Sequence, residues 1–445
     1  MNLYTLLRSR AEDHGPVRVG VIGAGKFASM FFTQVLGVPE MHVVGVVDLD
    51  VAKARAALGR TGWPEERYAC TSYDEALRTG GTVVADDAAG LIEHPQIEVV
   101  VEITGNPLAG VEHAVRSIDN GKHVVMVNVE ADCLVGPLLR RRAQQAGVVY
   151  SMAYGDQPAL IAELVDWCRT VGYEVVAAGK GTKYLPDYRF STPDTVWDHY
   201  GFSTEKIAAG DFNPKMFNSF LDGTKSAIEM AAVANATGLK PQQVGLQFPP
   251  ASVNDLSTLF RPATEGGILE HSGTVEIASC LERDGRSVEQ DLRWGVYVTF
   301  KARTEYAAAC FAEYGMVTDP SGYYGSLYRP YHLIGMELGV SIASAVLRGE
   351  PTGSVQAFEG DAVTTAKRDL CPGDVLDGEG GYCVYGQLQP AEASTALGAL
   401  PIGLAHGVKV TSSVREGQPV TWKDVEVDDT TVAVALRREM ERDFR

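Results

Sequence analysis

The chain has 445 residues, of which 45% are hydrophobic, and its formal net charge is −18. This length suffices for two or three domains with large cores. The acidic balance, with no basic stretch, argues against nucleic acid or an anionic membrane as a partner, and no apolar run is long enough to span a bilayer. A local group of Lys and Arg side chains could still bind an anionic substrate.

The seven cysteines are scattered, and none forms a C-x-x-C pair. The first residues, MNLYTLLRSRAEDHG, lack the apolar core and the cleavage site of a signal peptide. Both features predict reduced thiols in a cytoplasmic protein, rather than a disulfide framework or a zinc site.

In the first third of the chain, β-branched runs alternate with helical patterns. The expected strands are residues 17–22, 42–50, 97–104, 122–128 and 148–153. Alternation of this kind predicts right-handed βαβ units and a parallel sheet. We therefore expect an α/β fold whose residues 1–155 form a doubly wound, Rossmann-type dinucleotide-binding domain.

The rest of the chain predicts two further domains. Residues 156–350 read as an α+β substrate domain, with one helical segment at 214–237, an antiparallel hairpin formed by 274–282 and 292–302, and one long helix at 331–349. Gly, Pro and Val then dominate, which predicts a small all-β module at 351–430. Residues 431–445 read as a charged helix or a disordered tail.

A glycine-rich turn follows the first expected strand and fits the pattern G-x-G-x-x-[G/A]. Its residues are Gly23, Gly25, Lys26, Phe27 and Ala28. The first Gly permits the tight turn, the second lets backbone approach a pyrophosphate, and the small third position lets helix meet strand. The alternative is a glycine-rich βα turn without a ligand.

Polar residues end the next strands at the same expected edge of the sheet. Asp48 follows the second strand, where a carboxylate on the ribose hydroxyls would favour NAD over NADP; the alternative is an N-cap or surface Asp. Thr104, Gly105 and Asn106 follow the third strand, and Asn128 and Glu130 follow the fourth. Each of these five is equally well explained as a turn or cap residue.

Several basic and acidic residues in the second domain are candidates for substrate binding. Lys180 and Lys183 lie with an Arg in GKGTKYLPDYR and could bind phosphate or carboxylate; the alternative is a solvated loop. His332 could act as a general acid or base, although a lone His is more often structural. The further candidates are Asp255, Arg261 and Arg329.

The segment FLDGTKSAIEMAAVANATGL carries Asp222, Lys225 and Glu229 at spacings of three and four. On one continuous helix this spacing places all three on one face. The helix is otherwise apolar nearly all round, which predicts burial. The three residues are therefore either a paired ladder at one solvated edge or the working groups of a buried site, and periodicity leaves both open.

The runs VRVGVIGAGKFASMF, VVVEITGNP and GKHVVMVNVEAD resemble the dinucleotide-binding half of homoserine dehydrogenases. FLDGTKSAIEMAAVANATGL resembles the helix on which that family keeps a catalytic Asp and Lys, which implies these roles for Asp222 and Lys225. That family has Lys directly after the Asn that ends the fourth strand. Here the position is Val129, followed by Glu130.

A closer resemblance is to the branch with a C-terminal SAF-like domain, and it spans nearly the whole chain. It is carried by AYGDQPALIAELVDW, AAGKGTKYLPDY, MFNSFLDGTKSAIEMA, RPYHLIGMELG and AKRDLCPGDVLDGEGGY. This branch includes the 1-deoxy-D-xylulose-5-phosphate reductoisomerase-like (DRL) enzymes of isoprenoid precursor synthesis and members with sugar-acid catabolic activity. The resemblance implies NADP or NAD as the cofactor, with Mg²⁺ or Mn²⁺ as a further candidate.

The resemblance also implies roles for the candidate residues. Asp222 or Glu229 would be the base, and Lys225 or Lys183 would be the cation beside a developing enolate. Lys183, Arg261 or Arg329 would hold a substrate phosphate, and Glu130 would lie near the nicotinamide. The expected partners are a phosphorylated sugar or sugar acid and further copies of the chain in a homo-oligomer. The alternatives are a homoserine-type or sugar-acid dehydrogenase, and a dinucleotide-binding sensor without turnover.

Overall fold

The structure is a computed structural model that describes residues 2–209 and 212–444. The chain divides into two compact units, which are described separately. The first unit is Met1–Leu160 with His332–Gln356, and the second unit is Ile161–Tyr331 with Ala357–Arg445. Residues 332–350, which the sequence assigned to the substrate domain, thus lie in the first unit.

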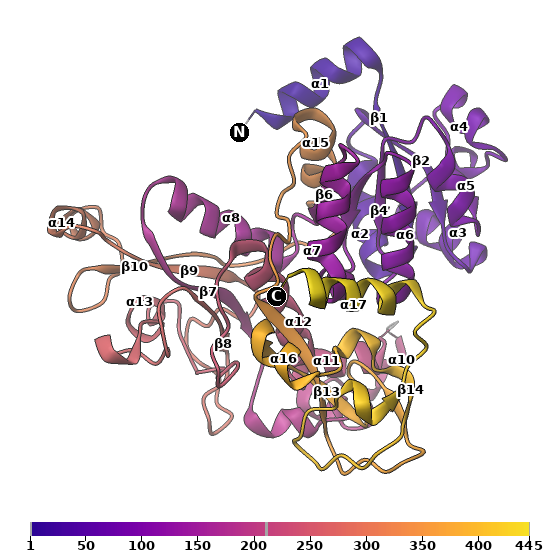
Figure 1. Cartoon of the computed structure of the whole chain (residues 1–445). Coiled ribbons are helices and arrows are strands. Elements are labelled where there is room, and N and C mark those ends of the chain that lie inside the picture. Colours follow the sequence, from indigo (N-terminus) through magenta and orange to yellow (C-terminus); the bar gives the residue numbers. More distant parts are fainter. Residues whose placement is uncertain (1, 210–211, 445) are drawn as a thin grey trace. The chain divides into compact units, whose positions relative to one another are not determined.

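The first unit contains a parallel sheet with the strand order β3-β2-β1-β4-β5-β6 (Figure 1). This is the doubly wound order of dinucleotide-binding folds, so the predicted fold class is confirmed. Val-rich strands form it because they are buried on both faces. The strands are β1 (Val17–Ile22), β2 (Met41–Val47), β3 (Val83–Ala85), β4 (Val99–Glu102), β5 (His123–Met126) and β6 (Tyr150–Met152).

Helices cover both faces of this sheet. One core cluster joins α1, α2, α3 and α15 to the sheet, and a second core cluster joins α4 and α5 to its other face. Figure 1 shows α6 and α7 running beside the strands. The helices are α1 (Leu3–His14), α2 (Lys26–Val35), α3 (Val51–Arg60), α4 (Tyr73–Thr79), α5 (Ala88–Glu93), α6 (Pro107–Asp119), α7 (Val129–Gln145) and α15 (Gly339–Arg348), with a 3-10 turn η1 (Glu65–Tyr68); α8 (Gln157–Thr170) crosses the division between the units.

The long helix expected at 331–349 is wrong in its first half, since α15 begins only at Gly339. The preceding segment packs closely against the first turns of α2. A Cβ atom on Gly335 would lie 2.5 Å from the carbonyl oxygen of Phe27. The segment before α15 thus packs against α2 instead of continuing the helix, and hydrophobic periodicity does not reveal this contact.

The second unit contains a mixed sheet with the order β10-β9-β7-β8 (Figure 1). Its strands are β7 (Glu174–Thr182), β8 (Thr274–Ser279), β9 (Val296–Lys301) and β10 (Tyr324–Arg329). The predicted hairpin of 274–282 with 292–302 is wrong, because β7 lies between β8 and β9. Strand β8 pairs with β7 in parallel, and β9 pairs with the other edge of β7 in antiparallel. The turn near Gly285 closes only a local bridge between Leu281 and Ser287.

The segment 214–237 is not one helix but two, α11 (Pro214–Leu221) and α12 (Thr224–Thr237). Asp222 caps the carboxyl end of α11, and Gly223 has φ +89°, a left-handed conformation that favours glycine. Asp222 therefore does not share a continuous helix face with Lys225 and Glu229. The expectation based on spacing fails because Gly223 redirects the chain between the helices.

The β module is present as predicted, and it packs on α12. Strand β11 pairs with β13, while β14 pairs with β12 and β15. The amide of Asn235 in α12 donates to the carbonyl oxygen of Gly360, and its oxygen accepts from the backbone of Glu359 and Gly360. The strands are β11 (Gly360–Ala366), β12 (Val375–Asp377), β13 (Val384–Pro390), β14 (His406–Val410) and β15 (Val425–Glu426).

The remaining elements of the second unit are short, apart from the helix at the carboxyl end. They are α9 (Val196–Tyr200), α10 (Thr204–Ala209), α13 (Leu256–Leu259), α14 (Glu305–Glu313), α16 (Ala391–Leu397) and α17 (Val432–Asp443), with 3-10 turns η2 (Pro186–Phe190), η3 (Ala263–Glu265), η4 (Ile402–Leu404) and η5 (Trp422–Asp424). The structure selects the helical alternative for the tail, because Val432–Asp443 form helix α17. Within residues 2–209 and 212–444, none of the helices combines the length and the apolar character that crossing a membrane requires.

Helix α17 is fixed by a buried ion pair between Arg437 and Asp361 of β11, whose side chains are 1% and 0% exposed. We expect Arg437→Met to lower the free energy of unfolding of the second unit by about 3–5 kcal/mol, because Asp361 is left buried without its cation. Urea denaturation followed by circular dichroism measures this change.

Two variants control this measurement. Arg437→Met combined with Asp361→Leu should recover most of the lost stability, since neither charge is then buried. Arg286→Met, which removes an exposed pair with Asp284, should barely change the denaturation midpoint. Equal effects of Arg437→Met and Arg286→Met would contradict the assignment.

Candidate active site

The glycine-rich turn after β1 has the geometry of a phosphate-binding turn. A Cβ atom on Gly23 would lie 2.8 Å from the carbonyl oxygen of Ile103, so this position requires glycine. A Cβ atom on Gly25 would meet nothing within 4 Å, so the backbone there is open to a ligand. Gly25 is the N-cap of α2 and provides no capping side chain, while Ala28 is fully buried against the core. These residues fit a dinucleotide whose pyrophosphate lies at the N-terminus of α2.

Asp48 lies beside this turn. Its Oδ2 accepts from the backbone N–H of Ala24 at 2.8 Å, and its Oδ1 accepts from the N–H of Asp50 at 3.0 Å. The N-cap of α3 is Asp50, which accepts from the N–H of Lys53, so the capping alternative belongs to Asp50 rather than to Asp48. The Asp48 carboxylate is half-exposed at the position where ribose hydroxyls bind in such folds.

The ends of β4 and β5 bring the other predicted cofactor residues together. Asn106 is the N-cap of α6 and accepts from the N–H groups of Leu108 and Ala109. The amide of Asn128 donates to the carbonyl oxygen of Asn106 at 2.8 Å. Thr104 and Gly105 form the turn between β4 and Asn106. The side chain of Asn106 therefore acts as a helix cap, which is the alternative explanation given for it. The side chain of Asn128 instead connects the segments that follow β4 and β5.

Glu102, the last residue of β4, is a buried carboxylate that the sequence interpretation missed. Its Oε1 accepts from the hydroxyl of Thr104 and lies 3.3 Å from Nδ1 of His113. Among the described residues, neither its Oε2 nor Oδ1 of Asn128 has a hydrogen-bond partner. Buried acceptors of this kind mark a place for a donor on water or ligand. The sequence does carry a signal for Glu102, because this carboxylate stands within the otherwise apolar run VVVEIT.

Helix α7 begins directly after Asn128. Val129, where homoserine dehydrogenases have Lys, is buried, and Glu130 is partly exposed in the first turn. One turn later Asp132 is fully buried, and its Oδ1 accepts from the hydroxyl of Tyr150 at 2.6 Å. Burial, helped by the nearby carboxylates of Asp156 and Glu130 and opposed by the hydrogen bond from Tyr150, raises the pKa of Asp132 to about 8. Asp132 therefore holds a proton at neutral pH.

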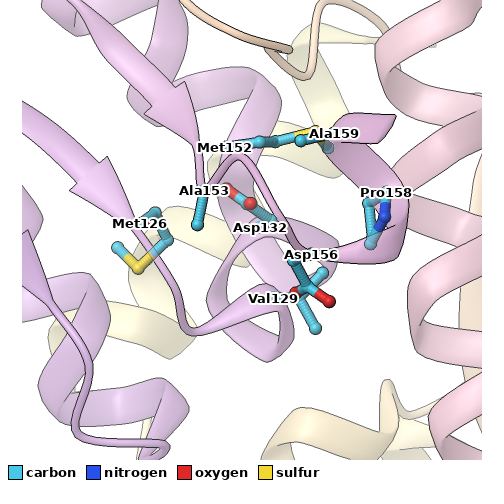
Figure 2. Close-up of a pocket in the computed structure, with 8 residues that line it drawn as sticks. All are labelled: Met126, Val129, Asp132, Met152, Ala153, Asp156, Pro158 and Ala159. Atoms are coloured by element: carbon cyan, nitrogen blue, oxygen red, sulfur yellow. The ribbon is translucent and has the colours of Figure 1, made fainter. Parts of the chain in front are cut away.

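Asp132 and Asp156 line a pocket beside the carboxyl ends of β5 and β6 (Figure 2). Apolar side chains supply the rest of its wall: Met126, Val129, Met152, Ala153, Pro158 and Ala159. The pocket lies at the carboxyl edge of the sheet, but it leaves no room for a water molecule and is a packing gap, not itself a ligand cavity. A neutral Asp132 in this apolar wall can donate a hydrogen bond, which an ionised one cannot.

In the second unit, Asp222 is 1% exposed and forms an ion pair with Lys367 of the β module. Lys367 Nζ lies 2.7 Å from Asp222 Oδ2 and 2.8 Å from the carbonyl oxygens of Ser191 and Gly381. All three ammonium protons thus have acceptors. Asp222 Oδ1 accepts from the N–H of Thr224. Lys367 was not among the predicted site residues, because nothing in AKRDL by itself indicates a distant carboxylate.

Glu229, on the second turn of α12, is 4% exposed and pairs with Lys180 of β7. Lys225, on the first turn, is partly exposed. The solvated-ladder alternative therefore fails for Asp222 and Glu229, which are buried and paired with residues from other elements. Lys180 likewise belongs to a buried strand, not to a solvated loop.

Lys183 follows β7 and donates to the carbonyl oxygen of His199, and its Nζ lies 5.7 Å from the centre of the Tyr200 ring. Burial lowers the pKa of Lys183, and the guanidinium of Arg293 lowers it further. Arg293, which the sequence interpretation did not single out, therefore lies within electrostatic range of Lys183. Two cations within electrostatic range of each other favour an anion nearby.

The remaining candidates are engaged locally. Arg261 forms a buried ion pair with Asp319 and donates to the carbonyl oxygens of Thr258 and Gly266, so its guanidinium stabilises the loop. Asp255 is an exposed turn residue that accepts from the N–H of Ser252. The guanidinium of Arg329, at the end of β10, lies 5.6 Å from the Tyr331 ring. His332 is partly buried in the first unit.

No cluster of three or more His, Cys, Asp or Glu side chains suitable for a metal ion occurs in the part of the chain that the structure describes. All seven cysteines are free thiols. We derive no step through Mg²⁺ or Mn²⁺.

Asp132→Asn tests the buried proton. In the folded protein Asp132 keeps its proton up to about pH 8, whereas an unfolded Asp releases it near its ordinary pKa of about 3.9. Between these values the unfolded state binds fewer protons, so wild-type stability falls as pH rises, by up to about 1.4 kcal/mol per pH unit. Asn cannot ionise, so the variant should gain stability relative to wild type from about pH 5 to about pH 8.

Urea denaturation across this pH range measures the difference. Tyr150→Phe is the matched control, because it removes the hydrogen bond but keeps the ionisable carboxyl group. Its free energy of unfolding should therefore still fall as pH rises, as in wild type. An Asp132→Asn curve parallel to wild type would show that Asp132 is already ionised in the folded state.

Comparisons with known proteins match three regions of the chain. Residues 17–126 match the model of an oxidoreductase family with an NAD-binding Rossmann fold. Residues 155–338 match the catalytic domain of oxidoreductase DRL, and residues 362–426 match the SAF domain. The resemblance inferred from the sequence is thereby confirmed.

Two homoserine dehydrogenases are similar over short regions. That of Pseudomonas aeruginosa is 27% identical over 134 residues, 30% of this chain and 28% of that protein. That of Methylobacillus glycogenes is 36% identical over 73 residues, 15% of this chain and 18% of that protein. The chain thus spans less than a third of the length of the curated relatives that it matches.

Among solved structures, a probable dehydrogenase from Thermotoga maritima is 13% identical with a TM-score of 0.38, over 75% of this chain and 90% of that chain. We base no inference on this distant likeness. The matched models describe an NAD-binding Rossmann fold, the DRL catalytic domain and a SAF domain, each over its own part of the chain, and the first two are models of oxidoreductases.

Proposed function

We propose that this protein is an NAD(P)-dependent oxidoreductase, and specifically a reductoisomerase that converts 1-deoxy-D-xylulose 5-phosphate to 2-C-methyl-D-erythritol 4-phosphate. The observation that carries the proposal is the buried, charge-paired group of Asp222 and Glu229 within the residues that match the DRL catalytic domain. Buried carboxylates persist where they are paired or functional. Both are held in place by lysines from other elements, which favours a preorganised site.

The proposed reaction first rearranges the carbon skeleton by a retro-aldol and aldol sequence. A base takes the proton of a substrate hydroxyl, a C–C bond breaks to leave an enolate, and the enolate adds to the new aldehyde. Asp222 or Glu229 is the candidate base. Lys225, at the first turn of α12, is the candidate cation that stabilises the enolate oxygen. The resulting aldehyde is then reduced to an alcohol.

The first unit would hold the dinucleotide that supplies the hydride. Gly23 and Gly25 admit its pyrophosphate, and the half-exposed carboxylate of Asp48 would accept from the ribose hydroxyls. A carboxylate there repels a 2′-phosphate, so Asp48 favours NADH, although the DRL resemblance implies NADPH. Which of the two is used is open to direct measurement.

A homoserine-type or sugar-acid dehydrogenase is the second candidate. The similarity to two homoserine dehydrogenases favours it, whereas the buried Val129 at the position of that family's Lys does not. A non-catalytic dinucleotide sensor is the third candidate. Cytoplasmic location and homo-oligomer formation stay predictions from the sequence.

The assay incubates the purified chain with 1-deoxy-D-xylulose 5-phosphate and either NADH or NADPH, with added Mg²⁺ or with chelator, and follows the absorbance of the reduced cofactor. We expect consumption by wild type and a kcat lower by roughly a hundredfold or more for Lys225→Ala, because a developing charge loses its cation. Lys240→Ala, an exposed lysine just beyond α12, should leave kcat unchanged.

Other outcomes select the alternatives. Oxidation of homoserine or a sugar acid with NAD⁺, without consumption of reduced cofactor by the pentulose phosphate, would establish the dehydrogenase. Dinucleotide binding with no turnover of any substrate, and with Lys225→Ala indistinguishable from wild type, would establish the sensor.

Asp48→Asn tests cofactor choice. Asn keeps an oxygen for the N–H of Ala24 but removes the charge, so the ratio of NADPH to NADH affinity should rise about tenfold, which corresponds to about 1.4 kcal/mol. Fluorescence titration with each reduced cofactor measures this ratio. Asp50→Asn should leave the ratio unchanged, since Asn is also a good N-cap for α3. A ratio unaffected by Asp48→Asn would remove Asp48 from the ribose site.

A further inference from the structure

Two buried acceptors lie at the carboxyl edge of the sheet in the first unit. Glu102 ends β4 and pairs with Met126 of β5, and Asn128 lies two residues beyond Met126. The side chain of Glu102 is 0% exposed, and Asn128 is 2% exposed. Among the described residues, Oε2 of Glu102 and Oδ1 of Asn128 have no hydrogen-bond partner. Buried acceptors of this kind are costly unless a donor from water or a ligand meets them.

A glycine on α6 leaves room beside both acceptors. A Cβ atom on Gly110 would lie 2.7 Å from Nδ2 of Asn128 and 3.2 Å from Oε2 of Glu102. The two side chains therefore converge on one point, which any larger residue at position 110 would fill. Glycine inside a helix is less stable than alanine, so this position favours room over helix stability.

The other polar atoms of the two side chains are already engaged. Oε1 of Glu102 accepts from the hydroxyl of Thr104 and lies 3.3 Å from Nδ1 of His113. Nδ2 of Asn128 donates to the carbonyl oxygen of Asn106 at 2.8 Å. These contacts hold both side chains in place and leave Oε2 and Oδ1 as the atoms for a further partner. Because both atoms are acceptors, this partner has to be a donor.

The chain directly after Glu102 contacts the phosphate-binding turn. A Cβ atom on Gly23 would lie 2.8 Å from the carbonyl oxygen of Ile103. In the strand order, β1 lies between β2, which leads to Asp48, and β4, which ends at Glu102. With the adenosine ribose at Asp48 and the pyrophosphate at the N-terminus of α2, a dinucleotide extends its nicotinamide half towards β4 and β5.

We propose that Glu102 and Asn128 accept the two N–H groups of the nicotinamide carboxamide. An amide NH2 carries two donor protons in one plane, one for each of the two converging acceptors. A ribose hydroxyl carries a single proton. The turn between β4 and α6 is exposed, and a Cβ atom on Gly105 would meet nothing within 4 Å, so its backbone is open to a ligand. The inference rests on the proposed dinucleotide dependence, but not on the identity of the substrate.

Isothermal titration of the full chain tests the proposal. The ligands are NAD⁺ or NADP⁺, whichever binds more tightly, and the 3-acetylpyridine analogue of the same dinucleotide, which has a methyl group in place of the amide NH2. We expect wild type to bind the natural dinucleotide about tenfold more tightly than the analogue, because the analogue leaves both acceptors unpaired. Glu102→Gln has one acceptor oxygen instead of two and cannot accept from both Thr104 and the carboxamide, so this ratio should fall towards one. Asn128→Ala, which removes Oδ1, should lower the ratio as well.

Two further variants sharpen the test. Gly110→Ala fills the space without removing an acceptor, and it should lower the ratio in the same way. Glu98→Gln is the matched control, because Glu98 directly precedes β4, roughly 13 Å along the strand from Glu102, and pairs with Arg10 and Arg18. It removes a carboxylate beside the same strand but should leave the ratio unchanged. Thermal unfolding of each variant shows whether it has kept its fold.

A wild-type ratio near one would overturn the proposal. So would a Glu102→Gln variant that weakens both ligands equally or neither, since its carboxylate would then serve a ribose hydroxyl, a water molecule or the fold. Wild type that binds neither dinucleotide would overturn this inference together with the proposed function. Binding with the expected ratios, but without consumption of the pentulose phosphate, would contradict the proposed reductoisomerase alone.

Discussion

The buried ion pair between Lys367 and Asp222 is the interaction on which the second unit depends. An ammonium and a carboxylate are costly to remove from water, and the cost is offset here because every ammonium proton meets an acceptor. Lys367 also donates to the carbonyl groups of Ser191 and Gly381, so it is tied to three other segments of the chain. Breaking it would leave a charge in the core, which makes this arrangement hard to vary.

This constraint gives the SAF domain a physical role. Through Lys367 it orients Asp222, through Asn235 of α12 it is tied to the backbone at Gly360, and through Gly386 it donates to the hydroxyl of Thr224 at the start of α12. The contacts of Asp222 and Thr224 lie at the first turn of α12, beside Lys225, and that of Asn235 lies in its last turn. The module therefore helps to position the residues of the candidate catalytic site, and it is packed on α12 rather than attached only through a linker.

In the first unit, one edge of the sheet carries buried acceptors that have no hydrogen-bond partner among the described residues. Gly25 leaves the N-terminus of α2 without a capping side chain, and buried acceptors on Glu102 and Asn128 end the neighbouring strands. A neutral Asp132 lies in the pocket beside β5 and β6. Polar groups without partners are costly in a core, so their gathering at one edge marks it as a place for a ligand.

The sequence by itself determined the parallel sheet, the glycine-rich turn and the β module, because strand periodicity and turn chemistry are local properties of the chain. It also selected Asp222 and Glu229, since charges in an apolar helix need an explanation. Only the tertiary structure decided their partners, Lys367 and Lys180, the break at Gly223, and the placement of β7 between β8 and β9. These features join residues far apart in the chain, and a hydrophobic pattern records that a residue is buried, but not what it is buried against.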